Sequence, residues 1–265
     1  MRDTPLTRRL RVAVHDALGQ LGLAAGWDPL GRGFRVRRLR RLGRDPLADV
    51  KRILGRAPRV VFDVGANTGQ TALACLHAFP GAAIYSFEPD PRTFARLRDT
   101  LRRHPRATPV ALALGDAEGE ATLYRAAFDQ MSSLLPAAAG AHQDPALLRA
   151  AGEITVPRTT VDRFRAEHAT GPVDLLKIDA QGYELHVLRG AADSLERGEI
   201  GLVYLEVQFV PAYEGQPSFS ALLDFLLRYG YRLVGLYETG FGQANHLVEA
   251  NALFVDERLS APRPR

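Results

Sequence analysis

Short runs of apolar and β-branched residues alternate with helix-like stretches after Pro58. The run 59–64 (RVVFDV) ends at a glycine and predicts a buried strand, and the following residues, 69–79, predict a helix. The alternation continues, with strands expected at 82–87, 108–114, 119–125, 173–179, 201–207, 231–237 and 250–255, and helices at 91–103 and 218–229. Strands that alternate with helices form a mainly parallel sheet with helices on both faces, so we expect an α/β fold.

One part of this pattern is irregular. The strand at 119–125 is expected to pair antiparallel with a neighbour, and the Ala-rich residues 126–152 predict an insertion with a short helix. In parallel sheets, ligands bind beyond the carboxyl ends of the strands. The residues that follow each predicted strand are therefore the candidates for function.

The first 57 residues differ from the rest in pattern and charge. Leucine and valine recur at helical spacing over 5–23 and predict an amphipathic helix. Residues 1–60 contain 15 Lys and Arg against 5 Asp and Glu, whereas the whole chain has a net charge of only +4. We expect two parts: a basic helical extension over 1–57 and a net acidic α/β domain over 58–265.

Three roles for the basic extension stay open. Its arginines can form a solvated helical face, or attract anionic lipid at a membrane surface or an anionic substrate carrier. Nucleic acid is disfavoured, because the arginines at 35–44 are not interleaved with aromatic residues and no binding motif is present.

The chain carries no expected export or spanning signal. No run approaches the roughly 18 apolar residues of a membrane span, and the stretch after Arg8 and Arg9 is broken by His15 and Asp16, which argues against a signal peptide. We expect a cytoplasmic protein. A single cysteine, Cys75, excludes a disulfide framework and a multi-cysteine metal site, and is expected in the core.

The first predicted strand leads into a glycine loop, 63–69 (DVGANTG). Gly65 permits a tight turn, and Gly69 lets the backbone approach a ligand at the start of the helix. The spacing is neither G-x-G-x-x-G nor G-x-x-x-x-G-K-[ST], which disfavours a phosphate-binding loop. Asp63 would repel a pyrophosphate, so the loop suits the cationic S-adenosylmethionine better than NAD.

An acidic residue ends the second predicted strand. Glu88 lies 19 residues beyond Gly69, at the distance where an acid holds the hydroxyls of a ribose. The alternative is a solvated acid at a strand end. Together with the glycine loop, Glu88 predicts a nucleoside-containing ligand.

Several sequence blocks occur in a fixed order: FDVGANTG, FEP, ALGD, SSL, LLKIDAQGYE and VLRGA. They resemble the FkbM family of S-adenosylmethionine-dependent methyltransferases over about residues 58–256. The resemblance implies a Rossmann-like class I methyltransferase fold with a mainly parallel seven-stranded sheet. It also implies S-adenosylmethionine as cofactor and O-methylation of a hydroxyl on a sugar, glycan or polyketide-type natural product.

The resemblance implies cofactor contacts in four segments. Asp63, Gly65, Asn67 and Gly69 would line the methionine part, and Glu88 and Pro89 would hold the ribose. Ala113 and Leu114 would lie near the adenine, and Ser132 and Ser133 would cover the active site. Many relatives have D-V-E-G where this chain has D-A-Q-G at 179–182. Gln181 cannot serve as a general base.

Transfer to a hydroxyl requires the acceptor oxygen near the methyl donor and a group that takes its proton. Asp179, at the end of a predicted strand, is the leading catalytic candidate; its alternative role is to cap the next helix. Glu206 lies inside an apolar strand, where an unpaired carboxylate would be costly, so it is either a second site residue or the partner of Lys177.

Two histidines are further candidates for the base. His246 lies in the polar segment 238–247, which could cover the acceptor, and His186 follows Glu184 on a helix near the site. A divalent ion between Asp179 and Glu206 is chemically reasonable, but a third protein ligand is not evident, so no metal is expected.

Two other functions stay open. A nicotinamide-dependent oxidoreductase has a similar sheet, but Asp63 and the missing G-x-G-x-x-G oppose it. A non-catalytic adaptor would use the basic extension on a membrane or polyanion and keep a degenerate methyltransferase domain. The sequence predicts a small-molecule or glycan acceptor without specifying it, and it gives no oligomeric state.

Overall fold

A computed structural model describes residues 23–27, 34–38, 42–138, 145–242 and 245–259. The chain divides into two compact units, 1–44 and 45–265. In the first unit, β1 (Leu23–Trp27) and β2 (Phe34–Arg38) form a two-stranded antiparallel sheet.

The prediction for the basic extension is only partly tested. The helix expected over 5–23 lies outside the described residues except for Leu23, which begins β1. The extension is not all helical, since the alternation of apolar and basic residues in 34–38 (FRVRR) is that of a strand. Helix α2 (Pro46–Leu54), although within 1–57, belongs to the second unit. The functional division at residues 57 and 58 stays a prediction.

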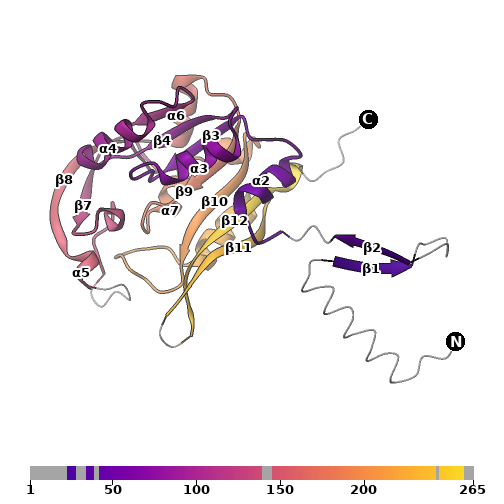
Figure 1. Ribbon diagram of the computed structural model, residues 1–265. Helices are drawn as coiled ribbons and strands as arrows, with labels where there is room; N and C mark the ends of the chain where they lie inside the picture. Colours follow the sequence, from indigo (N-terminus) through magenta and orange to yellow (C-terminus); the bar gives the residue numbers. More distant parts are fainter. Residues whose placement is uncertain (1–22, 28–33, 39–41, 139–144, 243–244, 260–265) are drawn as a thin grey trace. The chain divides into compact units, whose positions relative to one another are not determined.

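The second unit is built on a seven-stranded sheet with the order β11-β12-β10-β9-β3-β4-β5 (Figure 1). Its strands are β3 (Val60–Val64), β4 (Ala83–Phe87), β5 (Ala107–Val110), β9 (Val173–Ile178), β10 (Ile200–Gln208), β11 (Tyr231–Phe241) and β12 (Leu247–Asp256). The five strands from β5 to β10 are parallel to one another, and β12 is antiparallel to both of its neighbours. This confirms the predicted sheet.

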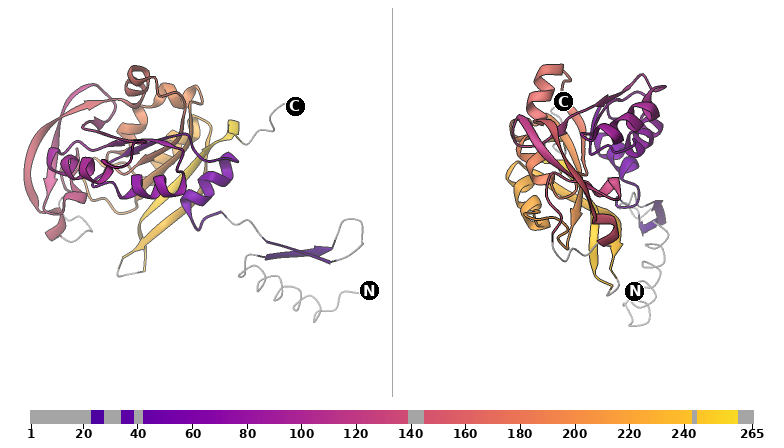
Figure 2. Two further views of the ribbon diagram at one scale, coloured as in Figure 1. Left: turned by 45° about the horizontal axis from the view of Figure 1, so that its top comes forward. Right: turned by 90° about the vertical axis from the view of Figure 1, so that its left-hand side faces the viewer.

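Helices cover both faces, because successive side chains of a buried strand point to opposite sides. On one face Val61 packs with α2, α3 (Gln70–Ala78) and α4 (Pro91–Leu101), and Cys75 of α3 is fully buried there. On the other face Phe62 packs with α6 (Val161–His168), α7 (Glu184–Arg189), α8 (Ala192–Glu196) and α9 (Phe219–Arg228). The right-hand view of Figure 2 shows the two helical layers on either side of the sheet.

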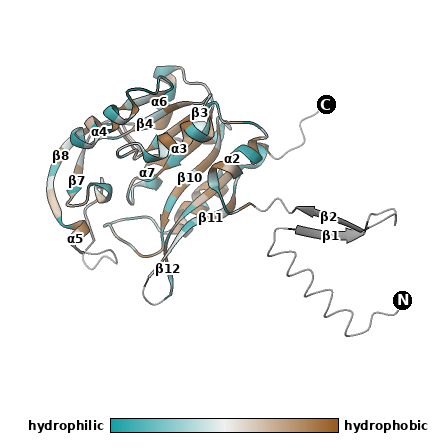
Figure 3. Cartoon of the chain, in the orientation of Figure 1, coloured by the Kyte–Doolittle hydropathy of each residue, from teal (hydrophilic) through white to brown (hydrophobic). Residues whose placement is uncertain are grey.

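Hydropathy follows the layers. In Figure 3 the strands of the central sheet are largely brown, and several of the helices, α2 and α3 among them, show teal residues beside brown ones. None of the helices in the described part has the length and apolarity that a bilayer crossing demands.

A second sheet of three strands, in the order β6-β8-β7, flanks the first. It contains β6 (Ala113–Leu114), β7 (Gly119–Ala126) and β8 (Ala150–Thr159), and β7 is antiparallel to β8 as expected. The strand predicted over 108–114 is divided, since β5 pairs in the main sheet whereas β6 pairs with β8. The insertion between β7 and β8 carries a 3-10 turn, η1 (Asp129–Met131), and the short α5 (Pro145–Leu148).

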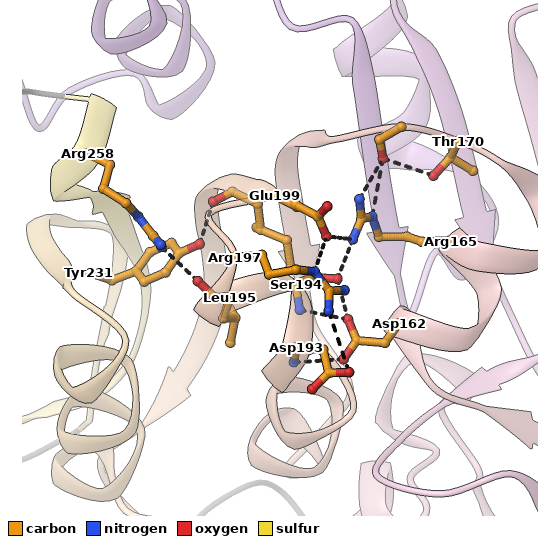
Figure 4. A network of polar contacts seen from close by, with 12 residues as sticks. Asp162, Arg165, Thr170, Asp193, Ser194, Leu195, Arg197, Glu199, Tyr231 and Arg258 are labelled. Atoms are coloured by element: carbon orange, nitrogen blue, oxygen red, sulfur yellow. Dashed lines mark hydrogen bonds and ion pairs between the residues drawn. The ribbon is translucent and has the colours of Figure 1, made fainter.

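A polar network fixes the amino ends of β9 and β10, away from the edge where ligands are expected (Figure 4). Asp162 of α6 accepts hydrogen bonds from the backbone N–H groups of Asp193 and Ser194, at 2.9 and 3.0 Å. Arg165 forms an ion pair of 2.9 Å with Glu199, the residue before β10. The network ties α6 to α8 and leaves the opposite edge of the sheet for function.

Candidate active site

A cavity of about 350 Å³ opens at the carboxyl ends of β3, β4, β9 and β10. Most of the predicted site residues lie in its wall: Gly65, Asn67, Glu88, Pro89, Ala113, Leu114, Ser132, Ser133, Asp179 and Glu206. Asp63, Gly69 and His246 are not among the residues that line it. Residues of η1 and the segment after it contribute another part of the wall.

The glycine loop is shaped by contacts within the protein. Gly65 has φ +71°, and a Cβ there would lie 1.8 Å from the backbone oxygen of Asp179. Glycine is therefore required because two strand ends approach each other closely. Gly69, with φ +96°, is the N-cap residue of α3, and a Cβ there would lie 3.1 Å from Leu97 on α4. Glycine at this position allows α3 to pack closely on α4, and the approach to a ligand expected from sequence stays a prediction.

Glu88 joins the first two loops of the site. Its Oε2 accepts a hydrogen bond from the backbone N–H of Asn67 at 3.1 Å, and its Oε1 accepts one from that of Asp90 at 2.9 Å. Burial raises the pKa of Glu88 to about 7, although the two backbone donors oppose the shift. The side chain is 8 % exposed, and it lines the cavity.

The opposite wall is apolar and belongs in part to the insertion. Its side chains are Leu112, Ala113, Leu114, Leu123, Met131 and Leu134. The strand that leads into the insertion is fixed to α4 by Arg125, which binds both oxygens of Asp90 at 2.6 and 2.9 Å. A second ion pair joins Arg96 to Asp129 of η1.

Under the cavity lies a buried ion pair. The Nζ of Lys177 is 3.2 Å from Oδ1 of Asp63 and 3.6 Å from Oδ2 of Asp179. Burial lowers the pKa of Lys177, but the charges of Asp63, Asp179 and Glu206 outweigh it, so the net shift is upward. Burial also raises the pKa of the fully buried Asp63, against the opposing effect of Lys177.

The negative charge facing the cavity comes from other residues than the sequence suggested. Asp63 lies below the cavity and is paired with Lys177, so it is not the charge that a ligand would meet. The carboxylates in the wall are instead Glu88, Asp129, Asp179 and Glu206. Among the described residues, Lys177 is the one basic side chain in that wall. The cavity still suits a cation better than a pyrophosphate, for a different reason.

Asp179 and Glu206 lie side by side at the ends of β9 and β10, and Gln181 joins them. The Nε2 of Gln181 donates to Oδ1 of Asp179 at 2.8 Å and to Oε2 of Glu206 at 2.9 Å. Burial, followed by the charges of Asp179, Glu184 and Glu249, raises the pKa of Glu206 well above its usual range, with Lys177 acting in the opposite direction. Sequence reasoning treated Gln181 only as a residue that cannot be a base, and missed this contact.

The alternative structural roles are filled by other residues. Helix α7 has no side-chain cap, so Asp179 does not cap it, and the backbone N–H groups of Ala180 and Gly182, ahead of the helix, donate to Oε1 of Glu184 at 3.0 and 3.1 Å. Lys177, considered as the partner of Glu206, is paired with Asp63 and Asp179.

The two histidines are placed differently from the carboxylates. His246 is exposed next to the turn between β11 and β12 and outside the cavity wall, and its proposed role as base stays a prediction. His186 stacks on Tyr183, with ring centroids 4.1 Å apart, and its Nδ1 lies 2.7 Å from Oδ2 of Asp116. In the part of the chain described, no group of three or more His, Cys, Asp or Glu side chains is arranged to hold a metal ion.

Residues 63–233 match the family model described as the methyltransferase FkbM domain. The chain belongs to this family. Membership confirms the resemblance, identifies the protein as a methyltransferase with a Rossmann-like α/β fold, and decides against the nicotinamide-dependent oxidoreductase.

Curated relatives of this FkbM-family chain include three named methyltransferases. The 2-O-methyltransferase NoeI of Sinorhizobium fredii is 27% identical over 213 residues, covering 78% of this chain and 83% of NoeI. The hexuronic acid methyltransferase AglP of Haloferax volcanii is 28% identical over 149 residues, 56% of this chain and 55% of AglP. The 31-O-demethyl-FK506 methyltransferase FkbM of Streptomyces tacrolimicus is 33% identical over 162 residues, 51% of this chain and 60% of FkbM. The chain thus aligns with little more than half of the last two relatives.

Solved structures resemble the FkbM-family chain more distantly. The METTL16 MTase domain is 15% identical with a TM-score of 0.47, covering 93% of this chain and 79% of that one. Precorrin-6y C5,15-methyltransferase from Geobacter metallireducens is 12% identical with a TM-score of 0.42, covering 79% and 86%.

Proposed function

We propose that this protein transfers the methyl group of S-adenosylmethionine to a hydroxyl on a sugar, glycan or polyketide-type acceptor. The observation that carries the proposal is that Asp179 and Glu206, both bound by Gln181, line the same cavity as Glu88. The names of the relatives support it, since they include a 2-O-methyltransferase, a hexuronic acid methyltransferase and a 31-O-demethyl-FK506 methyltransferase.

The residues of the cavity fit the cofactor in size and chemistry. A volume of about 350 Å³ lies within the roughly 300–1,000 Å³ of small-molecule sites. The apolar wall around Leu114 and Met131 suits a flat adenine, and Glu88 can accept hydrogen bonds from ribose hydroxyls. The excess of carboxylates suits a ligand with an ammonium and a sulfonium.

When bound, S-adenosylmethionine supplies an electrophilic methyl group on a sulfonium. The protein must orient the acceptor hydroxyl toward it and remove the proton. Glu206 is suited to take that proton, because burial and the neighbouring carboxylates raise its pKa and so make its carboxylate a stronger base. Asp179, on the adjacent strand end, would orient the acceptor or the cofactor's amino group.

Calorimetric titration with S-adenosylmethionine tests the cofactor assignment. We expect micromolar binding by the wild type, strong loss in Glu88→Ala, and wild-type binding in Glu120→Ala, which changes an exposed acid of β7 outside the cavity. NAD serves as the control ligand. Binding of NAD in place of S-adenosylmethionine, or of neither, would contradict the proposal.

The basic segment requires a separate experiment. We propose that the protein is cytoplasmic and that the arginines within 1–57 contact anionic lipid. Sedimentation with phosphatidylserine vesicles should decrease with added salt and should not occur with neutral vesicles. Salt-sensitive vesicle binding by a protein without affinity for S-adenosylmethionine would instead favour the non-catalytic adaptor.

A further inference from the structure

Gln181 has a backbone conformation that non-glycine residues rarely adopt. Its φ is +52°, in the left-handed region, and its side chain is nine-tenths buried. Such a conformation persists only where surrounding contacts hold it. Here the hydroxyl of Ser133 donates to the backbone oxygen of Gln181 at 2.6 Å.

The orientation of the Gln181 amide is fixed from behind. The hydroxyl of Tyr213, which follows β10, donates to Oε1 of Gln181 at 2.8 Å and also lies 3.0 Å from the backbone oxygen of Met131. Burial, and then the nearby carboxylates, raise the pKa of Tyr213, so the hydroxyl keeps its proton. With its oxygen occupied by Tyr213, the amide presents its NH₂ group to the cavity.

That NH₂ group matches what two adjacent carboxylates need. It carries two protons, and it lies 2.8 Å from Asp179 and 2.9 Å from Glu206. Two carboxylates this close repel each other, and hydrogen bonds to the charged form are what stabilise it. A carboxylate at position 181 would be a third negative charge in the same place.

We propose that Gln181, oriented by Tyr213, is a positioning residue that aims the carboxylates of Asp179 and Glu206 at the acceptor hydroxyl. The inference rests on the proposed function, because the acceptor hydroxyl belongs to it. Neither Gln181 nor Tyr213 takes a proton; they act through the two carboxylates.

The charged and titratable groups around Glu206 come from five elements or loops. Each of them also affects the titration of Glu206. They are Lys177 on β9, Asp179 in the loop after β9, Glu184 on α7, Tyr213 after β10 and Glu249 on β12. A change in the titration of Glu206 is attributable to Gln181 only if the other groups stay in place. The variants must therefore keep side-chain volume.

The experiment is a pH titration of the ¹³C-labelled Glu carboxyls of the full chain by NMR, with Glu206→Gln to assign the signal. Gln181→Met keeps an unbranched side chain of similar size and removes both donors. We expect it to move the titration midpoint of Glu206 upward by about one pH unit. Tyr213→Phe should move the midpoint in the same direction by less, because the amide is then free to turn.

Controls separate positioning from a structural role. Tyr204→Phe removes a buried tyrosine hydroxyl that donates to Glu238 instead, and should leave the midpoint unchanged. Adding Tyr213→Phe to Gln181→Met should shift the midpoint no further than Gln181→Met alone. Unchanged midpoints in both single variants, accompanied only by lower melting temperatures, would overturn the inference.

S-adenosylmethionine affinity, measured on the same samples, distinguishes the two proposals. Wild-type binding that persists within about threefold in Tyr213→Phe, together with the shifted midpoint, supports positioning. A wild type that does not bind S-adenosylmethionine overturns the proposed function, and the inference with it, whatever the titration shows.

Discussion

The ammonium of Lys177 lies 3.2 Å from Oδ1 of Asp63, and both side chains are buried, Lys177 in the wall of the cavity and Asp63 behind it. The pair comes from neighbouring strands, β9 and β3, at directly paired positions. Lys177 also lies 3.6 Å from Asp179 and donates to the backbone oxygen of Gly65 at 3.4 Å. One ammonium therefore balances a structural carboxylate and a cavity carboxylate while supporting the glycine loop.

Replacement of Lys177 by Met should destabilise the protein by about 3–5 kcal/mol, because Asp63 would be left buried without its counter-charge. The measurement is the free energy of urea unfolding, followed by circular dichroism. Arg232→Met is the matched control: it breaks an exposed ion pair with Glu257 and should cost less than about 1 kcal/mol. Asp63→Asn added to Lys177→Met should recover part of the loss; if it does not, the unpaired carboxylate is not the cause.

Two glycines with nearly the same backbone angle separate strain from steric contact. Gly65 has φ +71° and Gly55 has φ +68°, but a Cβ at Gly65 would lie 1.8 Å from a backbone oxygen, whereas one at Gly55 would meet no described atom within 4 Å. Gly55→Ala should cost about 1–2 kcal/mol from backbone strain alone. Gly65→Ala should cost more than about 4 kcal/mol in the same urea experiment. If the two variants lost the same free energy of unfolding, the glycine loop would have to relax away from β9 to accommodate the methyl group.

Glu88 should make cofactor binding depend on pH. Its pKa of about 7 means that the carboxylate form, which accepts hydrogen bonds from ribose hydroxyls, predominates only above neutrality. If the bound state needs that form, S-adenosylmethionine should bind about tenfold more weakly at pH 6 than at pH 8. Calorimetry at both values checks this, and the weaker binding of Glu88→Gln should change much less between them.

The same group should affect stability in the opposite direction. Its pKa is raised on folding from an ordinary value of 4.5, so the folded protein holds the proton more tightly than the unfolded chain. The contribution of Glu88 to the stability of the cofactor-free protein is therefore greatest below pH 4.5 and is lost as the pH rises through 7. Urea unfolding between pH 5 and 8 checks this: the free energy of unfolding of the wild type should fall relative to that of Glu88→Gln as the pH rises.

The bidentate pair of Arg125 with Asp90 should contribute stability with the reverse pH dependence. Burial raises the pKa of Asp90, but Arg125 and the backbone donors outweigh it, so the pKa lies below its ordinary value. Arg125→Met should cost about 2 kcal/mol at pH 7, the range of hydrogen bonds to charged groups. The difference from wild type should shrink below pH 4, as Asp90 becomes protonated. A loss that is constant with pH would indicate packing by the arginine stem.

Much of the main sheet was predictable because its strands are buried on both faces. Runs such as 60–64 and 173–178 are mostly apolar and β-branched, which predicts buried strands. These strands could be predicted from their own residues, without knowing which other strands they pair with. The rule that ligands bind at the carboxyl ends of strands placed Glu88, Asp179 and Glu206 at one cavity.

The parts that sequence reasoning missed depend on partners distant in the chain. Strand β8 contains Gly152 and Pro157 and is largely exposed over its first half, so it lacks the apolar run of a core strand. The bridge made by Gln181 depends on Tyr213, 32 residues later in the chain. It also depends on a left-handed backbone conformation, which a glutamine in the sequence does not predict. The pairing of Asp63 with Lys177 likewise becomes visible only when β3 and β9 are neighbours.

Cys75 gives the protein an intrinsic reporter of local opening. It is the only cysteine in the chain, it is fully buried on α3, and burial raises its pKa to about 12, so a thiol reagent reaches a reactive thiolate only after the helix separates from the sheet. Because α3 begins directly after the glycine loop, which lines the cavity, ligands that bind there should stabilise α3 and slow the labelling. Labelling rates can therefore rank compounds that occupy the cavity without knowledge of the methyl acceptor.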